Sequence, residues 1–122
     1  MLFRSRDHTE NILRQLGADC QSRQDKGIEY LSLTGPFQPK AFDYHIPVDP
    51  SSAAFFTVFG LLRKSHSTTI TDLLDNPTRT GYLRVLTKMT EQIKLSPAKD
   101  AKVFIEPTMT LEVEGKIGRA HV

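Results

Sequence analysis

The chain has 122 residues, a formal net charge of +2, 39% hydrophobic residues and 25% charged residues. This length suffices for one domain with its own core, and the composition is that of a soluble globular protein, not of a disordered one. The small net charge gives no indication of a nucleic-acid or membrane partner. No apolar run approaches the roughly 20 residues of a membrane span, and residues 1–7 lack the apolar segment of a secretory signal.

Cys20 is the single cysteine, so the chain cannot form an internal disulfide. This favours a reducing, cytoplasmic setting. No Cys/His pair surrounds Cys20, and we therefore interpret it as a buried structural thiol and not as a nucleophile.

The first predicted element is a short helix. Asp7 and Glu10 form a capping-box pattern, and apolar residues follow at helical spacing at positions 12, 13 and 16. Gly17 is suited to the left-handed backbone that ends a helix.

Strands are expected next at 18–22 and 28–33, with turn residues at 24–27 between them. Residues 35–39 contain two prolines and a glycine and predict a loop. The alternation of apolar and polar residues over 41–46 predicts a third strand.

Asp49 followed by Pro50 is typical of a helix start, with an N-cap and a proline in the first turn. The helix predicted over residues 51–63 is apolar almost all round. Such a helix must be covered on most sides.

A β-branched run at 68–74 predicts a strand. Asn76 and Pro77 repeat the opening seen at Asp49 and Pro50, and they predict a second N-cap. The apolar stripe of that helix consists of Tyr82, Leu83, Val85, Leu86 and Met89. Three more strands are expected at 92–95, 101–105 and 108–113.

Aligning Ile12 with Val85 also matches Leu13 with Leu86 and Leu16 with Met89. This weak internal repeat gives two copies of a helix followed by a strand. With the elements that precede the second copy, the repeating unit is β-α-β-α-β-β. We therefore expect an α+β fold in which two helices cover one face of a mixed sheet, with right-handed crossovers between parallel strands.

Three stretches carry a resemblance to a known family: SRDHTE at 5–10, IPVDPSSAAFF at 46–56 and NPTRTG at 76–81. Together they resemble the 5-enolpyruvylshikimate-3-phosphate synthase family, especially its bacterial branch with an SRDHTE stretch. They occur in the family's order and at comparable spacing, and the likeness covers nearly all of residues 5–95.

The resemblance implies a two-domain enzyme several times this length, each domain built from three β-α-β-α-β-β units. It implies transfer of the enolpyruvyl group of phosphoenolpyruvate to shikimate 3-phosphate in chorismate and aromatic amino acid biosynthesis. A cytoplasmic monomer without cofactor or metal is expected. Residues 1–116 would be part of one domain, with 1–40 the end of one unit and 41–114 the next unit. Residues 117–122 look like a translated sequencing adapter, a non-native tail.

Among the site residues, the resemblance implies that Arg6 binds the phosphorylated shikimate. A guanidinium beside a helix N-terminus combines two anion-binding features, which supports this role independently. A solvated surface arginine is the alternative. Ser5 is expected either to add a hydroxyl to the same anion or to assist the helix cap. Arg79 is expected to form a structural ion pair or a helix-end contact.

No catalytic residue is expected within the chain. The family's catalytic lysine motif, its catalytic acids and its phosphoenolpyruvate-binding arginines are not found in this sequence. Because proton transfer needs positioned acids and bases, the isolated chain is predicted to be inactive. Two departures stand out. Val48 replaces a glycine, which predicts a strained or rearranged turn, and Thr90 replaces another glycine.

Two other functions remain open. The related enolpyruvyl transferase that acts on a UDP-sugar shares the fold, but the SRDHTE stretch argues against it. A noncatalytic module of the same fold would bind phosphorylated metabolites, or bind a protein through the exposed face of its apolar helix.

Overall fold

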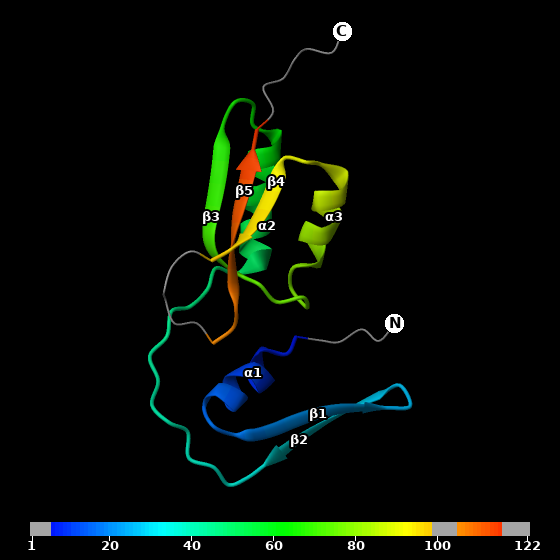
Figure 1. Ribbon diagram of the computed structural model, residues 1–122, viewed down its shortest axis with the longest axis vertical. Helices are drawn as coiled ribbons and strands as arrows, with labels where there is room; N and C mark the ends of the chain where they lie inside the picture. The colour runs from blue at the N-terminus through cyan, green and yellow to red at the C-terminus, as the bar shows by residue number, and fades with distance from the viewer. Residues whose placement is uncertain (1–5, 99–104, 116–122) are drawn as a thin grey trace. The chain divides into compact units, whose positions relative to one another are not determined.

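The computed structural model describes residues 6–98 and 105–115. The chain divides into two compact units, Met1–Tyr44 and His45–Val122. In the described residues the first unit has one helix and the second has two, each unit has its own sheet, and each is described by itself below (Figure 1).

The first unit consists of helix α1 (His8–Gln15) and an antiparallel hairpin of β1 (Asp19–Asp25) and β2 (Ile28–Thr34). Gly17, with φ of +96°, takes the left-handed conformation expected after the helix. The turn is shorter than predicted, because only Lys26 and Gly27 separate the strands. Both have positive φ, as hairpin turns of two residues require. Cys20 is buried and free, as expected for a structural thiol.

The capping box predicted at the start of α1 is not formed. Asp7 occupies the N-cap position, but its side chain makes no capping hydrogen bond. Its backbone angles, φ of −113° and ψ of 17°, differ from the extended conformation of an N-cap whose side chain reaches back to the helix. The pattern of Asp7 and Glu10 therefore predicted correctly where the helix begins, but the capping hydrogen bond that it also predicted is not formed.

The strand predicted over 41–46 is also wrong. Residues 35–47 contain no regular element, although the alternation of Phe42, Tyr44 and Ile46 is present in the sequence. A strand needs a hydrogen-bonded neighbour, and after the hairpin ends at Thr34 strand pairing resumes only at the bridge of Val48 with Leu73. The rings of Phe42 and Tyr44 instead stack on each other, with centroids 4.7 Å apart.

The second unit contains α2 (Pro50–Leu62), β3 (Ser67–Leu74), α3 (Gly81–Met89), β4 (Ile93–Pro97) and β5 (Thr108–Glu114). The sheet order is β3-β5-β4, and both pairings are antiparallel. Since β3 and β4 both run antiparallel to β5, they run in the same direction and leave room for β5 between them. The mixed sheet we expected is not present, because the one parallel pairing in the described residues is the isolated bridge of Val48 with Leu73.

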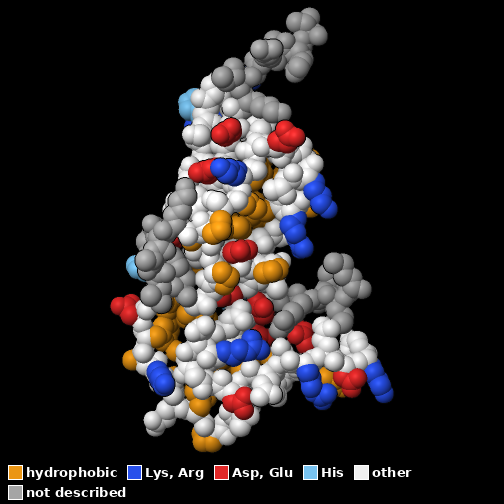
Figure 2. Space-filling view, viewed as in Figure 1, with side chains coloured by type: hydrophobic (Ala, Val, Ile, Leu, Met, Phe, Trp, Pro, Cys, Tyr) orange, Lys and Arg blue, Asp and Glu red, His pale blue; other side chains and the backbone are white. Residues whose placement is uncertain are grey.

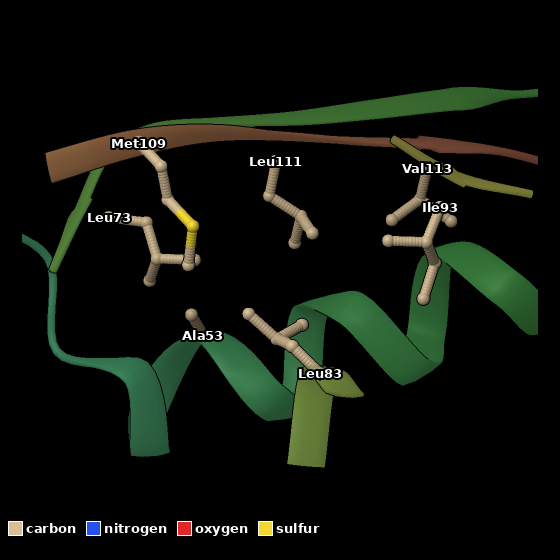
Figure 3. Packing of buried hydrophobic residues seen from close by; sticks show 7 residues of the cluster. All are labelled: Ala53, Leu73, Leu83, Ile93, Met109, Leu111 and Val113. Atoms are coloured by element: carbon tan, nitrogen blue, oxygen red, sulfur yellow. The ribbon is translucent and has the colours of Figure 1, made fainter. Parts of the chain in front are cut away.

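The core of the second unit lies between the sheet and its two helices. Figure 3 shows side chains from the three strands directed toward the helices, with Ala53 of α2 and Leu83 of α3 directed back toward the sheet. Two helices on one face of a sheet were expected, and this arrangement is confirmed. The buried cluster consists of Ala53, Leu73, Leu83, Ile93, Met109, Leu111 and Val113.

Helix α3 begins later than predicted. Asn76 is not an N-cap: its side chain accepts a hydrogen bond from the Thr78 backbone N–H (2.9 Å), and its carbonyl accepts one from Thr80 Oγ1 (3.0 Å). These bonds close a turn over residues 76–80, so the helix starts at Gly81. Asn76 is buried and also donates to Glu106 (2.7 Å), which ties the turn to the segment before β5.

The two units share an order of elements. Helix α1 begins at His8 and α3 at Gly81, positions that the internal repeat pairs with each other. Each helix is followed by a strand and then by an antiparallel partner strand. Of the strand predicted at 101–105, residues 101–104 lie outside the described residues, and Ile105 lies in a bend.

The two departures from the family pattern are accommodated without strain. Val48 does not have a left-handed backbone, which in the described chain occurs outside glycine only at Lys26, Ser65 and Asp72. Its N–H donates to the Asp72 carbonyl (2.8 Å) and its carbonyl accepts from the Leu74 N–H (3.1 Å). Thr90 ends α3 in an extended conformation that any residue can adopt. Of the two outcomes expected at Val48, a strained or a rearranged turn, the strained one is wrong, because Val48 has no left-handed backbone.

Large hydrophobic side chains remain exposed in both units, and on the face in Figure 2 they lie among acidic and basic ones. None of the helices within 6–98 and 105–115 has the length and apolar character needed to cross a membrane.

Replacing Leu111 by alanine tests the core. The side chain is fully buried in the central strand, so we expect the free energy of unfolding to fall by about 2–5 kcal/mol. Urea unfolding followed by circular dichroism measures it. Leu95→Ala in the adjacent strand is the matched control, because Leu95 is partly exposed and its truncation should cost clearly less. Equal losses for the two variants would contradict the assigned core.

Replacing Val48 by glycine tests whether this position is strained. Because Val48 is in an extended β-bridge, glycine should lower stability by about 0.5–1 kcal/mol through the added freedom of the unfolded chain. Urea unfolding again measures the change. A glycine variant more stable than the natural chain would show that the valine is strained after all.

Candidate functional site

Arg6 lies directly before Asp7, the N-cap residue of α1, and its side chain is exposed. The guanidinium is thus accessible beside the first turn of a helix. The Asp7 side chain does not cap the backbone N–H groups of that turn. An anion at this end of α1 would meet both a cation and helix N–H donors. Ser5, the other residue predicted to bind substrate, lies outside the described residues.

The second unit has a polar junction at the start of α2, built around Asp49. Its carboxylate accepts hydrogen bonds from the backbone N–H of Ser51 (3.3 Å) and of Ser52 (3.2 Å), and from the Ser52 hydroxyl (3.0 Å). Asp49 is therefore an N-cap, as predicted, and Pro50 fills the first helical position where its missing N–H costs nothing.

Arg79 completes the junction from the turn that precedes α3. Its Nη2 forms an ion pair with the Asp49 carboxylate and donates to Ser51 Oγ (2.9 Å). The Arg79 side chain is only 13% exposed, and that of Asp49 is 47% exposed. The prediction that Arg79 makes a structural ion pair is thus confirmed, with Asp49 as its partner. Two of the three stretches that carry the family resemblance meet here.

Tyr82 connects the first turn of α3 to the same place. Its hydroxyl donates to the carbonyl oxygen of Pro50 (2.8 Å). Burial raises the pKa of Tyr82, and the negative charge of Asp49 raises it further, so the phenol remains a donor through the neutral range. The sequence placed Tyr82 in the apolar stripe of its helix and gave no sign of this hydrogen bond.

The surroundings of the Asp49 carboxylate favour its ionised form. Desolvation opposes ionisation, but the Ser52 hydroxyl, the two backbone N–H groups and the charge of Arg79 together outweigh it. The pKa of Asp49 therefore lies below its usual range. A carboxylate held ionised by a cation and three donors is a poor proton shuttle at neutral pH.

The chemistry available at the two places differs. In the junction, the charged groups satisfy one another, and its effect is to fix the start of α2 against the turn before α3. At α1, the cation is exposed and next to helix N–H groups, which suits recognition of an external anion.

The family model for EPSP synthase, 3-phosphoshikimate 1-carboxyvinyltransferase, matches residues 3–118. The chain belongs to the EPSP synthase family. This confirms the family that the three sequence stretches indicated, and with it the α+β fold of enolpyruvyl transferases.

Relatives and a solved structure of the EPSP synthase family agree with this assignment. The chain is 36% identical over 110 residues to a 3-phosphoshikimate 1-carboxyvinyltransferase of Maricaulis maris, covering 90% of this chain and 24% of the relative. It is 40% identical over 111 residues to the enzyme of the same name from Afipia carboxidovorans, covering 89% and 24%. EPSP synthase from Acinetobacter baumannii superposes with a TM-score of 0.74 at 29% identity, covering 93% of this chain and 24% of that one.

The chain thus spans about a quarter of the length of the EPSP synthases that it matches. Residues 3–118, which the family model matches, contain both the SRDHTE stretch and the junction of Asp49 with Arg79.

Replacing Asp49 tests the junction and its dependence on pH. Asp49→Ala removes cap and ion pair and should lower stability by about 1 kcal/mol at pH 7, whereas Asp49→Asn keeps a good N-cap and loses only the charge. Because the folded-state pKa is depressed, the charge stabilises fully above the unfolded pKa of about 4 and progressively less as pH falls below it.

The measurement is urea unfolding of the natural chain and of both variants between pH 7 and pH 3. The difference between the natural chain and Asp49→Asn should be constant in the neutral range and shrink below about pH 4. A difference that persists unchanged at the acid end would contradict the assigned ion pair.

Proposed function

We propose that this chain contributes to the transfer of the enolpyruvyl group of phosphoenolpyruvate to shikimate 3-phosphate. The observation that supports this most strongly is the family match over residues 3–118, together with relatives named for this reaction. The role that follows for the chain is to bind part of the phosphorylated shikimate, within chorismate and aromatic amino acid biosynthesis in the cytoplasm.

Arg6 is the residue proposed to make that contact, with Ser5 beside it in the sequence. Two features of the start of α1 support a contact with phosphate. The Arg6 side chain is exposed, and the Asp7 side chain does not cap the first turn, whose N–H groups favour an anion as an arginine does. The remaining steps, which are binding of phosphoenolpyruvate and movement of protons, depend on the family's lysine, acid and arginine motifs, and these are not found in this sequence. The isolated chain is therefore proposed to be inactive, and a monomeric longer synthase is the proposed working form.

A chimera tests the proposal. The segment of the Acinetobacter baumannii synthase that aligns with this chain is replaced by this chain's own residues, and kcat and KM are measured for both substrates. We expect an active chimera in which Arg6→Ala raises KM for shikimate 3-phosphate by about 10- to 100-fold, the loss of a charge-assisted pair. The KM for phosphoenolpyruvate should change little.

Arg84→Ala is the control for this experiment, because Arg84 is an exposed arginine on α3. It should leave both KM values unchanged. An active chimera in which Arg6→Ala behaves like Arg84→Ala would remove Arg6 from the site but keep the family function. A chimera that folds and has no activity would contradict the proposed function itself.

A further inference from the structure

Helix α1 ends close to the strand that follows it. The Gly17 N–H donates to the Arg14 carbonyl (3.1 Å), and the Ala18 N–H donates to the Leu13 carbonyl (2.9 Å). These two bonds form a Schellman motif, in which Gly17 occupies the left-handed position. The connection therefore takes only three residues, 16–18, and it leaves α1 beside the start of β1 (Figure 1).

The Arg14 side chain continues this connection beyond the turn. Its Nε donates to the carbonyl oxygen of Cys20 in β1 (2.8 Å). Its Nη2 lies 3.5 Å from Ser22 Oγ, further along the strand, and its Nη1 lies 3.4 Å from Asn11 Oδ1 in the preceding turn of the helix. These last two distances are at the long limit for hydrogen bonds, so the bond to Cys20 is the principal contact.

The bond from Arg14 to Cys20 joins a charged donor to the interior of the first unit. A guanidinium remains protonated in proteins, and hydrogen bonds from charged donors are stronger than those between neutral groups. Cys20 is only 6% exposed, so water has limited access to this contact. Arg14 also lies in the last turn of α1, where a positive charge favours the helix. The side chain thus holds the C-terminal end of α1 to β1.

The position of Arg6 depends on the direction of the same helix. Arg6 precedes Arg14 by eight residues, which corresponds to about 12 Å along a helix. A tilt of about 10° around the C-terminal end of α1 would displace its N-terminal end by about 2 Å. Binding groups have to be held to within about 0.5 Å of their productive position. A small change in the direction of α1 is therefore sufficient to misplace Arg6.

We propose that Arg14 is a positioning residue for the binding of phosphorylated shikimate. By donating to the Cys20 carbonyl it fixes the direction of α1 on β1, and this direction places Arg6 and the N–H groups of the first turn for the phosphate. Arg14 acts through Arg6 and not by contact with the substrate. The inference rests on the proposed role of Arg6 in substrate binding.

The chimera with the Acinetobacter baumannii synthase tests this role through Arg14→Met, which removes the donors and keeps a long aliphatic side chain. We expect KM for shikimate 3-phosphate to rise by about 3- to 10-fold, while kcat and KM for phosphoenolpyruvate change by less than about twofold. Arg14→Lys keeps the charge and one donor group, so its effect should be smaller. Arg23→Met is the matched control, because Arg23 lies in β1 and stacks on the Tyr30 ring (4.4 Å from its centroid). It should leave both KM values unchanged.

A double variant separates an action through Arg6 from a direct effect of the Arg14 charge on the substrate. Once Arg6 is replaced by alanine, Arg14→Met should raise KM no further. Effects that multiply would overturn the proposal, and so would an Arg14→Met variant that behaves like Arg23→Met. In both cases an increase in KM caused by Arg6→Ala alone would leave the proposed function standing. If Arg6→Ala has no effect, the roles of both arginines are refuted.

Amide hydrogen exchange of the 122-residue chain provides a measurement that needs no activity. In Arg14→Met, the amides of α1 should exchange at least about threefold faster than in the natural chain, because the helix loses its side-chain contact with β1. Arg23→Met should leave their exchange unchanged, and circular dichroism establishes that both variants are folded. Equal exchange in Arg14→Met and in the natural chain would contradict the positioning role.

Discussion

The second unit depends on β5 for both its sheet and its core. This strand forms the hydrogen bonds to both β3 and β4, which do not pair with each other, and it supplies Met109, Leu111 and Val113 to the face beneath the helices. Alternate residues of one strand thus contact the side chains that anchor α2 and α3. Without β5, the two remaining strands would have unpaired edges and the helices would have little apolar surface to cover.

The junction of Asp49 with Arg79 fixes the ends of the same helices. One carboxylate caps α2 and also holds the turn before α3, while Tyr82 donates to the backbone of α2 from the other helix. These are contacts between two of the stretches through which the family can be recognised. Two of these stretches therefore have a structural role, since they hold α2 and α3 together. Arg6, the residue proposed to bind substrate, lies in the remaining stretch, SRDHTE at 5–10.

The elements whose signals are local could be predicted from the sequence. Gly17 ends α1, and Asp49 with Pro50 begins α2, because backbone conformation and N–H satisfaction at a helix end depend on a few neighbouring residues. The same signal was misleading at Asn76 and Pro77. There the side chain of Asn76 closes a turn and binds Glu106, a residue 30 positions away, and this partner could not be inferred from local sequence.

For the candidate site too, local features could be predicted from the sequence, whereas partners distant in the sequence could not. A structural role for Arg79 could be inferred, but its partner depends on how β3 brings the two turns together. The strand predicted at 41–46 was wrong for a related reason. Alternating apolar and polar residues show which side chains would share a face of a strand, but not whether another strand is there to pair with it. The valine at position 48 suggested strain by comparison with glycine, whereas its bridge to Leu73 allows an ordinary extended backbone.

The place of β5 in the chain has a consequence for biosynthesis. Of the strands in residues 6–98 and 105–115, β5 is synthesised last, after its partners β3 (Ser67–Leu74) and β4 (Ile93–Pro97). While the chain is being synthesised, the helices and the two outer strands therefore have to wait with their apolar sides uncovered until residue 114 is in place. Contacts between segments so distant in sequence slow folding. The nascent second unit is thus exposed to chaperones and proteases for the whole of that interval.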